Sequence, residues 1–132
     1  MSTIRVDNFG PSAGGTTYSA RGIAKAWVNF DGTGTIAARD SENVSSLTDN
    51  GNGDFTITFS SGMNAADYSA NIDHNGNGSL NASWMAHSIF SSAHSTTVAP
   101  TTSAYRFCTF HPGNLVNQDC TYNTSSAHGD LA

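Results

Sequence analysis

The chain has 132 residues, a formal net charge of −5 and only 11% charged residues, against roughly 25% in an average soluble protein. Ten acidic residues outnumber five basic ones, so nucleic-acid phosphates would be repelled and we expect no nucleic-acid partner. No run approaches the ~18 apolar residues of a transmembrane helix, and the opening Met1–Val6 has no apolar signal segment, so we expect neither membrane insertion nor secretion.

Residues 1–21 differ in composition from the rest of the chain. Ile4, Val6 and Phe9 are spaced apolar residues, and a run rich in Gly, Pro and Ser follows at 10–15. This pattern predicts an extended arm that ends in a flexible linker. Three apolar side chains cannot form a core, so the arm is either a frayed terminus or an attachment element that docks on a neighbouring protein. We therefore predict an attachment arm at 1–21 and a folded domain at 22–132.

The first strand of that domain is predicted at 23–30. Ile23 and Trp27 lie on one face, and the opposite face is also apolar, with Val28 and Phe30. Two-sided burial is expected of a central strand or of a strand packed against another subunit. We therefore predict a homotrimer, with these four residues in its seam or in the core.

The next segments predict strands joined by tight turns. A turn at 31–34 precedes expected strands at 35–38 and 43–48, and the Asn-Gly repeat at 50–53 predicts a hairpin, because both residue types tolerate positive φ. The strand after this hairpin is expected to be half-buried because apolar residues alternate with polar ones, at Phe55, Ile57 and Phe59. A second hairpin with the same Asn-Gly repeat is predicted at 68–84; its apolar positions are Tyr68, Ala70, Ile72, Leu80, Ala82 and Trp84.

The last part of the chain is predicted to contain a long polar loop at 91–103, a strong strand at 105–110, a turn at 111–114 and a returning strand at 116–122. No segment has the pattern of an amphipathic helix. Strands at intervals of about 10–12 residues with Gly and Asn turns predict an all-β fold, an antiparallel, jelly-roll-like β-sandwich with an extended N-terminal arm.

Cys108 and Cys120 flank the last predicted hairpin at equal offsets from Asn114. That symmetry would place them opposite each other, either as buried thiols or as a cross-strand disulfide. His111 and His128 give the pair a faint likeness to a zinc site, and the Asp-rich turns at 49–54 and 73–78 resemble calcium loops. Hairpin turns use the same residue types for backbone reasons, so we predict no metal and no cofactor.

The sequence gives little sign of a common active site. It has no His-Glu-x-x-His pair and no phosphate-binding glycine loop before a helix, and the Gly-x-Ser-x-Gly string at 10–14 is not followed by the helical pattern that a nucleophile elbow requires. We therefore predict that the protein is not an enzyme. The aromatic residues are expected mainly in core or intersubunit packing, and the alternative is a cluster that stacks on sugar rings.

Three segments resemble a family of tailed-bacteriophage tail-fibre or virion appendage proteins that is frequent in marine and cyanobacterial phages. They are GIAKAWVNFDGTGT at 22–35, ARDSENVSS at 38–46 and TDNGNGDFT at 48–56. The opening MSTIRVDN, the Gly14-Gly15 pair and the ending HGDLA are also similar to family members, whereas residues 81–126 show no family pattern.

The resemblance implies a non-enzymatic virion protein, made in the bacterial cytoplasm of the host and displayed on the particle as a homotrimeric fibre or appendage domain. Its expected partners are other virion proteins, held through the arm, and a host surface glycan or receptor. The alternative is a capsid decoration protein that stabilises the phage head. The family carries over no catalytic residue.

Overall fold

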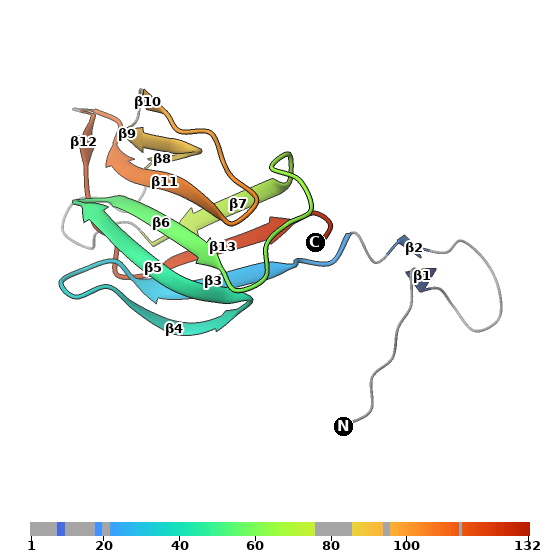
Figure 1. Ribbon diagram of the computed structural model, residues 1–132. Coiled ribbons are helices and arrows are strands. Elements are labelled where there is room, and N and C mark those ends of the chain that lie inside the picture. The colour runs from blue at the N-terminus through green and yellow to red at the C-terminus, as the bar shows by residue number, and fades with distance from the viewer. Residues whose placement is uncertain (1–7, 10–17, 20–21, 76–85, 94–95, 114) are drawn as a thin grey trace.

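The computed structural model describes residues 8–9, 18–19, 22–75, 86–93, 96–113 and 115–132. Its main body is a sandwich of two antiparallel sheets (Figure 1). The four-stranded sheet has the order β4 (Ala37–Glu42), β3 (Ala26–Asp31), β13 (Asn123–His128) and β7 (Ser69–His74). The described residues contain no α-helix. The predicted all-β antiparallel sandwich is therefore confirmed.

The five-stranded sheet has the order β12 (Val116–Asn117), β11 (Ala104–His111), β6 (Asp54–Phe59) and β5 (Val44–Gly51), and β8 (Ala86–Ile89) also pairs with β11. Two shorter strands, β9 (Ser91–Ala93) and β10 (Thr96–Thr97), pair with each other. They lie inside the segment 91–103, which the sequence predicted as a loop.

The core lies between the sheets because apolar residues alternate along the facing strands. Phe30 of β3 packs edge-on against Phe55 of β6, with ring centroids 5.2 Å apart, and Phe107 of β11 completes this cluster. A second cluster joins Phe59 to Tyr68 and Tyr105. Aromatic residues of the predicted core are confirmed as buried at Phe55, Phe59, Tyr68, Tyr105 and Phe107.

The first predicted hairpin is confirmed. It joins β5 to β6, and both of its glycines have positive φ, 131° at Gly51 and 61° at Gly53. For the second hairpin, the incoming strand is confirmed as β7, with Tyr68 and Ile72 buried. Its turn and the predicted outgoing residues, including Trp84, lie outside the described residues.

The predicted returning strand at 116–122 is wrong beyond its first two residues. Only Val116 and Asn117 pair with β11, and the chain then crosses to the other sheet as β13. This strand was not predicted, because its sequence NTSSAH has no large apolar residue. It is nevertheless an inner strand, paired with both β3 and β7.

The N-terminal segment contains β1 (Asn8–Phe9) and β2 (Tyr18–Ser19), which pair only with each other among the described strands. Phe9 of the predicted arm therefore lies in β1. The other two arm residues, Ile4 and Val6, lie outside the described residues, as does the Gly-rich run at 10–15 between the two strands. Among the residues whose burial the structure describes, the core of the sandwich begins at position 26.

Candidate ligand-binding face

The outward side of the four-stranded sheet carries two rows of side chains that cross the strands. Trp27 of β3 is paired with Ser126 of β13, which is paired with Asn71 of β7. In the second row, Asn29, Thr124 and Asp73 are paired in the same order. Because their neighbours Val28, Phe30, Ser125 and Ile72 are buried, the pleat turns these six side chains outward. We call them the outer face.

The outer face carries two shallow, open hollows. One hollow of about 420 Å³ is lined by side chains of all three strands, including Trp27, Asn71, Asp73 and Ser126. A second hollow of about 250 Å³ is lined by Asp73, His74, Asn75, Tyr122 and Thr124. The two hollows share Asp73 and Thr124, so they adjoin along the sheet.

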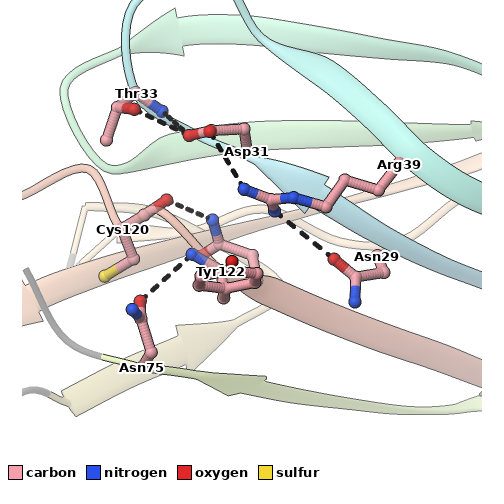
Figure 2. A network of polar contacts seen from close by, with 8 residues as sticks. Asn29, Asp31, Thr33, Arg39, Asn75, Cys120 and Tyr122 are labelled. Atoms are coloured by element: carbon pink, nitrogen blue, oxygen red, sulfur yellow. Dashed lines mark hydrogen bonds and ion pairs between the residues drawn. The ribbon is translucent and has the colours of Figure 1, made fainter.

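Arg39 of β4 is held over this side of the sheet by three contacts (Figure 2). Its guanidinium lies 4.1 Å from the centroid of the Tyr122 ring, and it donates to Asp31 at 3.0 Å and to Asn29 at 3.4 Å. The pKa of Asp31 is lowered, first by the Thr33 hydroxyl, which donates to its carboxylate, and last by Arg39. The cation is thus neutralised locally by Asp31.

Backbone contacts fix the loop that presents Tyr122. The Tyr122 amide donates to Oδ1 of Asn75, and the Asn75 amide donates to the Tyr122 carbonyl, both at 3.1 Å. The carbonyl of Cys120 accepts from the Gly32 amide at 3.0 Å and from Nδ2 of Asn123 at 2.7 Å. The aromatic ring therefore stands on a rigid support, although Tyr122 itself is half exposed.

The structure divides the four predicted seam residues into two pairs. Val28 and Phe30 are buried in the protomer's own core, which is the core alternative of that prediction. Ile23 and Trp27 are exposed, at 52% and 38%. The aromatic pattern had suggested a place in the core or in an intersubunit contact for Trp27. In the protomer it is not a core residue but an exposed part of the outer face.

Of the two alternatives for Cys108 and Cys120, the structure has buried thiols and no disulfide between them. The register explains why. Phe110 pairs with Asn117 and His111 with Val116, so the hairpin is not centred on Asn114 and the two cysteines are not opposite each other. Cys108 pairs instead with Asp54 and Ser88. Burial raises the pKa of the Cys108 thiol.

The Asp-rich turn at 49–54 uses its carboxylates for contacts within the fold, one with the backbone and one with an arginine side chain. Oδ1 of Asp49 accepts from the Gly51 amide at 2.9 Å, and Asp54 binds the Arg106 guanidinium through both oxygens, at 2.7 and 2.8 Å. Within the described ranges, no three His, Cys, Asp or Glu side chains are grouped as metal ligands would be. The other Asp-rich turn extends beyond the described residues after Asn75.

Most of the outer face was missed from the sequence. Thr124 and Ser126 belong to a strand that was not predicted, and Asn71 was seen only as a polar position of its strand. The inward positions of this strand are Asn123, Ser125 and Ala127, which are buried. Such small residues give no hydrophobic alternation, so the sequence carried no signal for the strand.

No family model, curated protein or solved structure matches the chain. In the part that the structure describes, no helix is long and apolar enough to cross a membrane.

Proposed function

We propose that the protein is a non-enzymatic structural protein of a tailed-bacteriophage virion, a fibre or appendage domain that is displayed on the particle and contacts the host surface. The sequence resemblance over 22–56 supports this proposal. The observation that carries it is how the sandwich uses its polar groups. Several charged side chains are held in pairs within the fold, while a broad, shallow face of small polar residues, with Trp27 and Asp73 among them, is turned outward.

The structural pairs are specific. Asp54 is held by Arg106, Asp31 by Arg39 and Asp49 by the backbone of its own turn. A general acid or base needs a carboxyl or imidazole that reaches a bound substrate, whereas these carboxylates face partners within the fold. A rigid sandwich that presents a shallow outer face is better suited to adhesion than to catalysis.

The experiment that tests the proposal is localisation in purified particles. An antibody against the chain, imaged by electron microscopy on intact phage, should label the tail or its appendages, and mass spectrometry should detect the chain in washed virions. Label over the head shell would make the protein a decoration protein instead. Absence of the chain from washed particles would overturn the proposal.

The assembly is part of the same proposal. Because Val28 and Phe30 are used inside the protomer, a homotrimer would have to be held by other surfaces, and we propose the edge at Ile23 together with the N-terminal arm. Multi-angle light scattering at micromolar concentration should give three chains per particle. A monodisperse monomer would contradict the trimer.

A further inference from the structure

We propose that the outer face binds a neutral oligosaccharide, with the Trp27 ring stacked on one sugar ring. This inference deepens the proposed function, because it names the chemistry by which a displayed domain would contact a surface. It rests on four properties of the face: its size, its side-chain chemistry, its charge and its lack of a large apolar patch.

The size of the face matches one or two sugar rings. The rows Trp27–Ser126–Asn71 and Asn29–Thr124–Asp73 each cross three strands, so each spans about 10 Å and the two rows lie about 7 Å apart. The hollow over them has about 420 Å³ and adjoins another of about 250 Å³. Such volumes are in the range of small-molecule sites, roughly 300–1,000 Å³ in total.

The side chains supply what a pyranose requires. One side of a sugar ring presents C–H groups, which pack on the negative face of an aromatic ring, and Trp27 is exposed at the wall of the hollow. Sugar hydroxyls both donate and accept. The amide of Asn71, the hydroxyls of Thr124 and Ser126 and the carboxylate of Asp73 together provide both functions within the two rows.

The charges around the face favour a neutral ligand over an acidic one. Asp73 lies in the hollow, and Asp40 and Glu42 of β4 extend the same two rows, paired with Asn29 and Trp27. Arg39, whose guanidinium lies over the Tyr122 ring at the second hollow, is bound to Asp31. A sialylated or sulfated glycan would meet these carboxylates without a free counter-charge from Arg39 and would be repelled.

A second copy of the chain is a poorer occupant. A stable protein interface buries about 800 Å² per partner around a core of apolar and aromatic residues. The six residues of the outer face include one large apolar side chain, Trp27, and the others are small or polar. Small polar side chains beside one exposed aromatic ring are the arrangement expected of a site that binds a polyol.

The test uses the full chain on an immobilised array of neutral gluco-, galacto-, manno- and N-acetylglucosamine oligosaccharides, with sialylated and sulfated glycans on the same slide. We expect binding to at least one neutral series and none to the acidic ones. Trp27→Ala should weaken binding at least ten-fold, Trp27→Phe should retain part of it, and Asn71→Ala should also weaken it. Leu115→Ala, at the exposed tip of the β11–β12 hairpin, is the matched control and should bind normally.

Three array results would overturn the inference: no neutral glycan bound, binding only to acidic glycans, or binding unchanged in both Trp27→Ala and Asn71→Ala. A change of oligomeric state in Trp27→Ala, measured by light scattering, would also overturn it, since that would make the face a subunit seam. Melting temperatures identify any variant that fails to fold, and in that case the other variant decides. The array uses isolated protein, so its result is independent of where the chain lies in particles.

Discussion

Asp54 shows how a single residue pair links burial to charge. Asp54 is only 6% exposed, and its carboxylate forms a bidentate ion pair with the Arg106 guanidinium between β6 and β11. Such bidentate pairs are stronger than single contacts. Removal of one partner is costly because the buried charge that remains has lost its solvation and its counter-ion.

We predict that Arg106→Leu lowers the free energy of unfolding by about 3 kcal/mol, toward the low end for a broken buried pair because Arg106 is partly exposed. The matched control is Arg39→Leu, which breaks the more exposed pair with Asp31 and should cost under about 1 kcal/mol. Urea unfolding at pH 7 measures both values. Equal losses in the two variants would contradict the prediction.

Asp119 makes the stability of the fold depend on pH. Its pKa is raised, mainly by burial, although the Gly53 amide donates to its carboxylate at 2.6 Å and opposes the shift. A carboxyl whose pKa is higher in the folded state destabilises the fold when ionised, so its contribution improves as the pH falls toward the ordinary Asp value of about 3.9.

We therefore predict that Asp119→Asn is more stable than the natural chain at pH 7 and that this difference shrinks at pH 4. The amide oxygen of Asn can still accept from Gly53, so the substitution removes the charge and keeps the contact. Urea unfolding of both proteins at the two pH values tests this. The exposed Asp67→Asn controls for a general change in net charge, and a difference that grows on acidification would refute the assignment.

At the scale of elements, the β5–β6 hairpin is clamped to the loop between β12 and β13. Nδ2 of Asn52 donates to the Asn117 carbonyl at 2.6 Å, and the Asp119 amide donates to Oδ1 of Asn52 at 3.0 Å. Gly53 lies at the centre of this contact. A Cβ there would come within 2.4 Å of the Gln118 amide nitrogen and of the Thr109 carbonyl oxygen.

We predict that Gly53→Ala destabilises the protein by about 3 kcal/mol or more, because alanine at this position has both an unfavourable positive φ and a clash between its Cβ and neighbouring backbone atoms. Gly34→Ala is the control: its φ of 63° is almost that of Gly53, but nothing lies within 4 Å of the added Cβ. That variant should lose only about 1 kcal/mol, the cost of the left-handed conformation alone. Thermal unfolding of both variants separates the clash from the conformational cost.

At the scale of the whole molecule, the core residues that the structure describes lie within the sandwich. They run from Ala26 to Ala127, and the strands β1 and β2 are paired with each other. Among the residues whose burial is described, none of this core comes from the arm at 1–21. This division is what an attachment element joined to an independent domain requires.

We predict that deletion of residues 1–15 leaves the unfolding temperature of the isolated protein nearly unchanged and abolishes its incorporation into particles. Differential scanning calorimetry and quantitative mass spectrometry of purified virions measure the two effects. The full chain supplied on the same expression background is the control. Incorporation of the truncated chain at the normal copy number would show that the arm is only a frayed terminus.

The sequence by itself determined the fold class and the hairpin at 50–53. Alternation at Phe55, Ile57 and Phe59 is a local pattern, and Asn-Gly turns carry their own backbone preference, so neither depends on distant parts of the chain. The same local information predicted β3 and the strong strand at 105–110.

Only the tertiary structure decided what β13 is and which side of β3 meets the core. NTSSAH becomes an inner strand by pairing with β3 and β7, and its Ser125 hydroxyl contacts the Tyr105 hydroxyl of the opposite sheet, which no local pattern records. Trp27 was predicted to be buried, since a strand with two apolar faces looks central from the sequence. It stays exposed because only the side of β3 that carries Val28 and Phe30 meets the core. Trp27 lies on the other side, paired with Ser126 on the outer face. Contacts across about a hundred residues of sequence, not composition, created the candidate site.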